Sequence, residues 1–468
     1  MRTWRCAATV LVAVSMATSG CTENEHCDAA SLEGALDDAV AGDTVQIGAC
    51  RIVGTFVVPS GVTLHGAGRG QSTLVVDGEG PALKLMAGER AALAQDLSIE
   101  SDGRIALRVM AGEAAGVERV DVVATLGVGL GAEDVSSLTL SEVSLNGPVD
   151  AENDGDVPYP VALEESATYG LVLVRVGDAS LTDVTVSGFA SFGAQLVESA
   201  TTWHGGGAPA NLGTGLMVHG GSATLEGVDL SGTLQGFRGM PAYAGVFTGG
   251  ASIVTDAVTA NGSEGLGLMH DDVTARHRGL TAVGNYEAGV WAQHCTTFEL
   301  SGSGSTVSDN GFAGVVLVDS SDVTIADARV DASAAMVSTV GQWGAIEVGD
   351  GLHIVEPVGP ITLRDLSLSG NERVGLLVDL QGGSTDTLFI EGVVVSGSSG
   401  QLGALAQDGD VVEGWDASVT REDATLANDA AFEGTLETVT AVASDGTEFP
   451  DTPVTLDQGI AGIIGDCC

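Results

Sequence analysis

Residues 285–292 read Asn-Tyr-Glu-Ala-Gly-Val-Trp-Ala, and residues 310–317 read Asn-Gly-Phe-Ala-Gly-Val-Val-Leu. Both stretches begin with Asn, continue for three residues to Gly, and then run on with mostly apolar residues. Self-similarity at a regular period marks a stacked repeat architecture, in which each unit packs against its neighbours. The pattern occurs at Asn211–Gly215, Asn261–Gly265, Asn285–Gly289, Asn310–Gly314 and Asn371–Gly375.

The spacing of the repeats and the period of their apolar residues predict short strands. Gly265 and Gly289 are 24 residues apart, and Gly289 and Gly314 are 25 apart. Apolar residues follow the period of two that is typical of strands, and no unit contains a helical pattern. In the unit that begins at Asn310, a second short strand is expected at residues 323–325. We therefore predict an all-β fold, a parallel β-helix whose successive coils lie about 4.8 Å apart.

The Asn residues are expected to line up along the column. Asn tolerates the left-handed backbone of a tight corner, and its amide can bond an Asn one coil away. Asn261, Asn285 and Asn310 should therefore lie in one file. The Gly four residues later is expected at a bend or a close backbone approach.

The N-terminal region adds a cap to this picture. Residues 31–42 read as a short amphipathic helix that ends at Gly42, followed by strands at 43–47 and 57–64. Together with the repeats, these segments resemble the right-handed parallel β-helix proteins of the pectin-lyase-like superfamily, over roughly residues 30–430. The resemblance implies a β-helix over residues 43–430 and a C-terminal cap or tail over residues 431–468. Enzymes of this fold commonly hold a polysaccharide in a groove along one sheet, although one fold hosts many functions.

The first residues read as an export signal. A short basic start is followed by an apolar stretch, residues 6–16, that is too short to span a bilayer. Residues 17–21, Ala-Thr-Ser-Gly-Cys, resemble a bacterial lipobox. The resemblance implies a lipoprotein-type signal peptide over residues 1–20, lipidation of Cys21, and an anchor-and-cap segment over residues 21–42. We expect an exported outer-membrane lipoprotein that faces the periplasm or the cell surface and meets the membrane only through this lipid.

Cysteine usage suits an oxidising compartment. Cys27 and Cys50 flank the expected cap helix and first strand, so a disulfide between them would staple the cap. Cys295 fits a buried thiol, the common fate of a single cysteine. Cys467 and Cys468 end the chain, and nothing in the sequence assigns them a partner.

The charge excludes one class of partner and suggests one cofactor. The chain has 63 acidic and 17 basic residues, a formal net charge of −46, which argues against nucleic-acid binding. Acidic oxygens are the ligands that Ca²⁺ prefers. Asp150, Glu152, Asp154 and Asp156 alternate before and after Gly155 like the front of a calcium loop, but the usual closing Glu is absent. A plain polar loop is the alternative.

An apolar stripe is expected on the outside of the column. If residues one and three places after each repeat Gly point inward, the residue two places after it points outward. Such a stripe either stacks on sugar rings or is covered by loops. Its predicted members are Met217, Phe247, Gly267, Trp291, Val316, His353 and Leu377.

Two histidines follow the stripe. His270 and His294 each stand five residues after a repeat Gly and are expected to be neighbours one coil apart. With Met269 and Cys295 nearby, they could hold a soft or borderline metal. Ordinary polar corner residues are the alternative. Similar repeats occur in a periplasmic copper-processing accessory protein, so a metal-handling accessory is one function to consider.

The enzyme hypothesis rests on two carboxylates and two guanidiniums. A lyase acting on uronic polymers needs a base and charge neutralisation, for which Asp271, Asp272, Arg276 and Arg278 are the candidates. The motif set of pectin hydrolases is not met, because Asp271-Asp272 stands alone. The leading hypothesis is therefore a non-catalytic binding or structural role with a polysaccharide or another envelope protein as partner. A polysaccharide lyase or glycoside hydrolase is the alternative.

Overall fold

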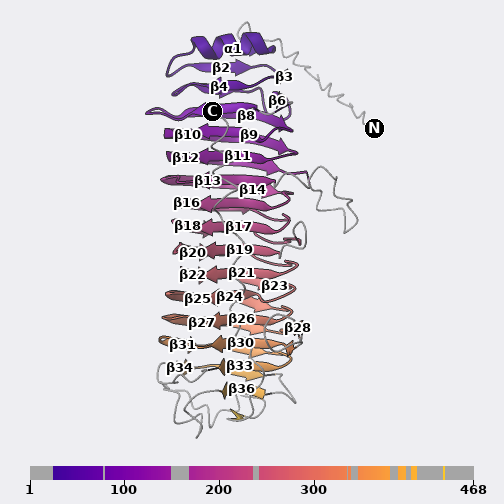
Figure 1. Ribbon diagram of the computed structural model, residues 1–468, viewed down its shortest axis with the longest axis vertical. Helices are drawn as coiled ribbons and strands as arrows, with labels where there is room; N and C mark the ends of the chain where they lie inside the picture. The colour runs from indigo at the N-terminus through magenta and orange to yellow at the C-terminus, as the bar shows by residue number, and fades with distance from the viewer. Residues whose placement is uncertain are drawn as a thin grey trace, which may run out of the picture.

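The computed structural model describes residues 25–76, 78, 80–148, 168–235, 242–334, 336–338, 346–379, 388–396, 402–407 and 436–437. Within these ranges the chain winds into a long column of stacked coils, with the helix α1 at its N-terminal end (Figure 1). Two sheets, named sheet A and sheet B, run along the column and pair their strands in parallel. The predicted right-handed parallel β-helix is confirmed.

Sheet B contributes one strand from each coil. Its 15 strands are β4 (Phe56–Val58), β7 (Leu83–Met86), β9 (Ile105–Met110), β11 (Val128–Glu133), β13 (Tyr169–Val174), β15 (Phe192–Val197), β17 (Thr214–His219), β19 (Tyr243–Thr248), β21 (Leu266–Asp271), β24 (Val290–Gln293), β26 (Ala313–Val318), β30 (Asp350–Val355), β33 (Val374–Asp379), β36 (Leu402–Gln407) and β37 (Leu436–Glu437).

Sheet A covers the remaining sides of the coil, with one long strand or two short ones per coil. Its 20 strands are β1 (Glu25–His26), β2 (Thr44–Ile47), β3 (Arg51–Val53), β5 (Thr63–His65), β6 (Thr73–Val76), β8 (Ala92–Ser101), β10 (Gly112–Ala124), β12 (Val135–Asn146), β14 (Asp178–Ser187), β16 (Ala200–Gly207), β18 (Ser222–Glu226), β20 (Ser252–Asp256), β22 (Thr274–Arg278), β23 (Thr281–Val283), β25 (Thr297–Ser308), β27 (Val323–Asp331), β31 (Ile361–Arg364), β32 (Ser367–Ser369), β34 (Leu388–Glu391) and β35 (Val394–Ser396). A short antiparallel hairpin, β28 (Met336–Ser338) with β29 (Ile346–Val348), interrupts the coil before β30.

The long strands of sheet A turn at stacked charged residues. Asp96, Arg119 and Glu142 occupy equivalent positions in successive coils, and all three have left-handed backbones with φ of 55°, 52° and 52°. The Arg119 guanidinium donates to the Asp96 carboxylate, with Nε 2.7 Å from Oδ1. This hydrogen bond lowers the pKa of Asp96, so opposite charges link consecutive corners.

The core is the inside of the column. Inward residues of both sheets form one continuous apolar cluster that extends from the cap to the last coils described. Leu107, Leu130 and Leu171 stack in this way along sheet B, at one level per coil. Few aromatic residues fit so narrow an interior, and Trp203 is the largest side chain that is fully buried in it.

The N-terminal cap closes one end of this core. Helix α1 (Ala29–Asp38) begins after Asp28, whose carboxylate accepts from the backbone N–H of Ser31 at 2.9 Å. Its Leu32 and Leu36 are buried against the first coil. The helix ends at Asp38, earlier than the predicted end at Gly42.

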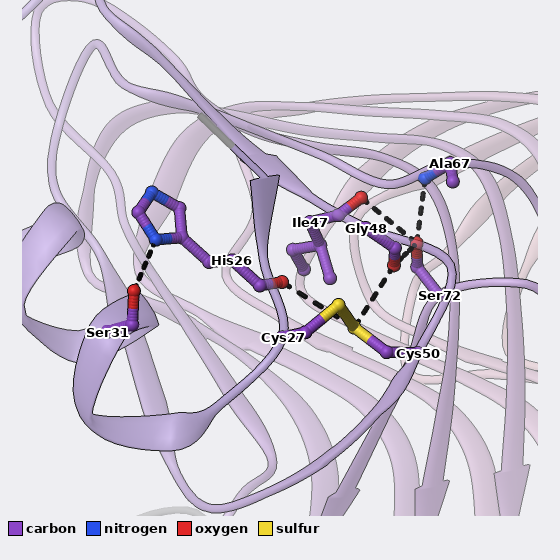
Figure 2. The surroundings of a disulfide bond; sticks show 8 residues. All are labelled: His26, Cys27, Ser31, Ile47, Gly48, Cys50, Ala67 and Ser72. Carbon is purple, nitrogen blue, oxygen red and sulfur yellow. Dashed lines mark hydrogen bonds between the residues drawn. A yellow bond between two sulfur atoms is a disulfide. The ribbon is translucent and has the colours of Figure 1, made fainter. Parts of the chain in front are cut away.

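The predicted disulfide between Cys27 and Cys50 is present in the structure (Figure 2). It joins the segment before α1 to the turn before β3. Beside it, the Ser72 hydroxyl donates to the carbonyl of Gly48 at 2.7 Å. The disulfide therefore ties the cap to the first coil of the column.

The predicted Asn file is only partly correct. Asn285 and Asn310 are equivalent, and the Nδ2 of Asn285 donates to Oδ1 of Asn310 at 3.0 Å. Asn261 lies two residues out of line. Ser263 occupies the position equivalent to Asn285, and its backbone N–H donates to Oδ1 of Asn285 at 2.9 Å. In most cases the side-chain oxygen of the Asn accepts a hydrogen bond from a backbone N–H of the neighbouring coil rather than from another side-chain amide. The buried polar residues of this corner are Asn211, Thr233, Ser263, Asn285, Asn310, Ser333 and Asn371.

Candidate functional site

The central outward positions of sheet B form a nearly continuous apolar file. Strand pairing places one residue from each of seven coils in register, and each is at most 5% exposed. An outward face this apolar is built like an interior rather than like a solvated surface. We call this set the outer file of sheet B, and its members are Met217, Val246, Met269, Trp291, Val316, His353 and Leu377.

The predicted stripe was wrong at two positions, Phe247 and Gly267. Phe247 pairs with Val218 and His270 and points into the core. Gly267, and not Gly265, aligns with Gly289, since the backbone N–H of Leu268 bonds the carbonyl of Gly289. The Asn261 repeat is therefore displaced by two residues. A shift of this size keeps the alternation of a strand but moves each residue to a new level.

Aromatic side chains flank the outer file. Tyr243, Trp291 and Phe312 belong to one apolar cluster on the outside of sheet B, and the rings of Trp291 and Phe312 are 6.0 Å apart. Farther along the same face, the rings of Tyr169 and Phe192 stack at 5.6 Å. Burial raises the pKa of Tyr169 and the pKa of Tyr243. Trp291 offers no open ring face for stacking on a sugar, since it is only 5% exposed.

A polar cluster interrupts this apolar face near β30 and β33. Asp350 is fully buried, and the Arg373 guanidinium donates to its two oxygens, with Nε 2.8 Å from Oδ1 and Nη2 2.5 Å from Oδ2. Nδ1 of His353 lies 3.2 Å from Oδ2, which is within ion-pair distance but outside hydrogen-bond geometry. Burial alone would raise the pKa of Asp350, but the interactions with Arg373 and His353 outweigh burial and lower it.

His353 is the unusual member of this cluster. Its side chain is 1% exposed, and neither ring nitrogen has a hydrogen-bond partner. Buried polar atoms normally have partners, because an unpaired one costs about 1–3 kcal/mol. An imidazole whose ring nitrogens are unpaired can form a hydrogen bond with, or exchange a proton with, a hydroxyl group placed against it. The cluster is therefore a candidate site for polar recognition or proton transfer.

The sequence pointed to His353 but missed its two partners. Asp350 occupies a position at which β19, β21 and β26 carry Tyr243, Leu266 and Ala313. Arg373 lies inside the Asn371–Gly375 repeat. A charged residue at an otherwise apolar level was the only signal available, and it required the register of the coils.

The predicted catalytic residues lie on different parts of the coil. Asp271 ends β21, and its Oδ1 is 2.9 Å from Nδ1 of His294. Arg276 and Arg278 project outward from β22 in sheet A, where Nε of Arg276 is 3.6 Å from Oε2 of Glu299. In the described part of the chain, no ion pair joins these arginines to Asp271 or Asp272, so the structure does not assemble the four residues into one cluster.

The two predicted histidine neighbours are also separated. His270 is completely buried in the core, whereas His294 lies at a corner with φ of 51° and a side chain that is 32% exposed. Nε2 of His294 is 3.9 Å from Oδ2 of Asp319, so its neighbours are carboxylates. Within the described ranges, no three His, Cys, Asp or Glu side chains are grouped so as to hold a metal ion.

The remaining predicted residues divide in two. Cys295 is a buried free thiol, as predicted, and burial raises its pKa to about 12. The lipidation candidate Cys21, the terminal Cys467 and Cys468, and the calcium candidates Asp150, Glu152, Asp154 and Asp156 lie outside the described residues. Among the helices that the structure describes, none has the length and apolar character needed to cross a membrane.

Comparison with known proteins assigns no family. No protein-family model matches the chain, and no curated protein matches it. Among solved structures, the chain is similar to the A-module of the mannuronan C-5 epimerase AlgE6 from Azotobacter vinelandii, at 13% identity and a TM-score of 0.39, over 82% of this chain and 95% of that one.

Two further structures show the same level of likeness. The alginate lyase from Paenibacillus sp. str. FPU-7 is 13% identical with a TM-score of 0.30, over 73% of this chain and 97% of that one. The catalytic unit of the GH87 α-1,3-glucanase from Streptomyces thermodiastaticus strain HF3-3 is 12% identical with a TM-score of 0.33, over 91% of this chain and 69% of that one. Identities and TM-scores this low assign no activity, substrate or mechanism.

Proposed function

We propose that this protein is an exported, envelope-anchored β-helix with a non-catalytic binding or structural role. The observation that carries the proposal is the outer file of sheet B, which is mostly apolar and at most 5% exposed over seven coils within this chain alone. Because the chain itself already covers this face, the face serves as part of the fold and offers no open groove for a polymer.

The file is built as a packing surface rather than as a sugar site. Sugar sites present exposed aromatic rings, whereas this file consists mainly of buried aliphatic side chains such as Met217, Val316 and Leu377. The formal net charge of −46 also opposes long acidic polysaccharides unless cations bridge them.

Export and anchoring rest on the N-terminal sequence. Residues 1–20 read as a signal peptide, and Cys21 is in the position of a lipidated cysteine. The disulfide between Cys27 and Cys50 supports this proposal, because structural disulfides persist in oxidising compartments. Metabolic labelling with a palmitate analogue tests it: the wild type should be labelled, and a Cys21→Ser variant should not.

Site-specific photocrosslinking in the producing cell tests whether the outer file is covered. A photoreactive residue at Val316, which is 1% exposed on the outer file of sheet B, should crosslink only within the chain. The same residue at Val254, which is 42% exposed on the outside of sheet A, is the matched control and should crosslink more readily to other molecules. A crosslink from Val316 to a second polypeptide would refute a covered face. Saturable binding of a polysaccharide that Trp291→Ala abolishes would replace the structural role with glycan binding.

A second candidate function, a polysaccharide lyase or glycoside hydrolase, is favoured by one observation. Asp350 holds a carboxylate beside His353, and both nitrogens of that imidazole lack hydrogen-bond partners. An imidazole with an unpaired ring nitrogen is a common general base. Incubation with neutral and acidic polysaccharides should then release unsaturated or reducing ends, and His353→Gln should abolish the release. His204→Gln, at an exposed histidine on sheet A, is the control and should leave it unchanged.

A further inference from the structure

Two histidines meet inside the column at a single coil. His270 points inward from β21 in sheet B, and His277 points inward from β22 in sheet A. Their Nε2 atoms are 2.8 Å apart, and the side chains are 0% and 1% exposed. The rings pack edge-on to one another and against Phe298, and Phe247 lies 5.0 Å from the ring of His270.

The partners of the two rings fix where the hydrogen atoms lie. Nδ1 of His270 is 3.3 Å from the carbonyl oxygen of Trp291, which can only accept, so this nitrogen carries the hydrogen. In a neutral ring, Nε2 of His270 must then accept. The donor facing it is Nε2–H of His277, which leaves Nδ1 of His277 to accept from the Thr255 hydroxyl at 2.9 Å.

The result is one directed chain of hydrogen bonds across the core. It runs from the Thr255 hydroxyl in sheet A, through both imidazoles, to the Trp291 carbonyl in sheet B. Every polar atom of the two rings is used, and both rings are neutral. A buried polar network of this kind is stable only when it is complete.

One additional proton disrupts the pair. On Nε2 of His270 it sets two N–H groups against each other at 2.8 Å, and on Nδ1 of His277 it turns the Thr255 hydroxyl from donor to acceptor. Either position leaves a positive charge in an apolar interior. The inward residues facing the pair from β19, β20, β24 and β25 include Phe247, Thr255, Ala292 and Phe298, none of which titrates.

Among the described residues, no titratable group near the ends of these strands forms an ion pair with either ring. Cys295 is a buried thiol in the turn after β24, while Asp271, Asp272 and His294 are partly exposed or exposed near the ends of β21 and β24. Burial together with the neighbouring His277 lowers the pKa of His270 well below 6.5, and burial lowers the pKa of His277 to about 4.

We propose that His270 and His277 form an acid-sensitive latch between the two sheets, which holds the coil closed while both rings are neutral and opens it when a proton is taken up. The latch lies in the coil whose outward residue is Met269, and it is hydrogen-bonded to the backbone of Trp291 in the next coil, so it lies directly beneath the outer file of sheet B. Acidification would therefore loosen that part of the outer face first. The inference stands on the core geometry and does not depend on the proposed function.

Hydrogen exchange and denaturant unfolding test the latch. If the unfolded chain binds two protons with pKa near 6.5 and the closed coil binds none, the opening constant should rise by roughly 10³-fold between about pH 7.5 and about pH 5. This rise should appear in the amides of residues 266–300 and be absent from β9 and β11. The double variant His270→Leu/His277→Leu should lose it, and His204→Gln should keep it.

Nitrogen-15 NMR of the histidine rings keeps the inference falsifiable if the double variant does not fold. The wild type should show an Nδ1–H tautomer for His270 and an Nε2–H tautomer for His277, both unchanged from pH 7.5 to pH 5.5 in the folded state. Either ring titrating near pH 6.5 in the folded protein would overturn the latch. An acid-induced rise in exchange that is the same in the double variant would also overturn it.

Discussion

The outer faces of sheet A and sheet B belong to the same coils but have opposite chemistry. On sheet A, Thr224, Val254 and Arg276 occupy one outward file, and polar or charged residues also flank it on the solvent side. On sheet B, the equivalent outward file holds Met217, Trp291 and Leu377, and all are buried. Both sheets share the parallel ladder and the apolar interior, so neither the ladder nor the core accounts for the difference.

The magnitude of the difference explains why it is informative. Exposing a fully buried aliphatic or aromatic side chain costs about 1.5–3 kcal/mol. The six apolar positions of the outer file amount to on the order of 10 kcal/mol, which is comparable to the whole stability of an ordinary domain. Sheet A can face water at no such cost. The outer face of sheet B is therefore a covered part of the fold, and a surface open to partners is to be sought on sheet A.

The largest expected difference between the faces concerns arginine. Arg373→Ala leaves the carboxylate of Asp350 buried and unpaired, so we expect a loss of about 3–5 kcal/mol in the free energy of unfolding. Arg276→Ala on sheet A removes an exposed pair and should change stability by about 0.5 kcal/mol or less. Urea unfolding of both variants measures this. Equal effects would mean that the cluster on sheet B is not buried.

Truncation of an apolar side chain is the next test. Met217→Ala should lower the free energy of unfolding by about 2–5 kcal/mol, because Met217 is 1% exposed and a cavity remains. Val254→Ala on sheet A, at a side chain that is 42% exposed, should stay within about 0.5 kcal/mol. Thermal unfolding of the wild type and the two variants under the same conditions measures these losses. A loss below about 1 kcal/mol for Met217→Ala would contradict a covered face.

An isosteric exchange sharpens the comparison. Val316→Thr buries a hydroxyl on sheet B and should cost about 1–3 kcal/mol. Thr224→Val on sheet A makes the reverse change at an exposed position and should be neutral within about 0.5 kcal/mol. Opposite outcomes for the two variants would show that the outer faces had been assigned the wrong way round.

The smallest expected effect is a dependence on pH. The pKa of Asp350 is lowered below its ordinary value of 3.8, so its ionised form stabilises the folded state. That contribution is present above pH 3.8 and is lost as the pH falls through the lower folded-state pKa. The stability difference between the wild type and Asp350→Asn should therefore narrow in acid. A difference that stayed constant below pH 3.8 would contradict the assignment.

Some elements followed from local pattern alone. The spacing between repeats implied coils of two or three strands, and the strands at 315–318 and 323–325 appear as parts of β26 and β27. The cap helix and the disulfide between Cys27 and Cys50 were also predicted. These elements depend on residues close together in sequence or on a pattern repeated many times, which is why they could be read from one sequence.

Other assignments failed because they depended on register between coils. Phe247 was placed on the outside and His270 at a corner. Gly245 pairs with Leu216 rather than with Gly215, and the Asn261 repeat is displaced by two residues, so both side chains point into the core. The hydrogen-bonded pair of His270 and His277 could not be found in this way, because it joins strands of two different sheets across the interior. Asp350 and Arg373 meet for the same kind of reason, across neighbouring coils 23 residues apart.

The sequence alone determined that this chain stacks short strands into a capped column, since a period of 24 or 25 residues with alternating apolar positions has few other ways to bury its side chains. It also determined the acidic surface and the two cysteines, Cys27 and Cys50, whose disulfide links the cap to the first coil. Only the tertiary structure decided which apolar residues face inward, which histidines meet, and which outer face is buried. Those outcomes depend on how each coil aligns with the next, and a shift of two residues changes every neighbour without disturbing the pattern within the strand.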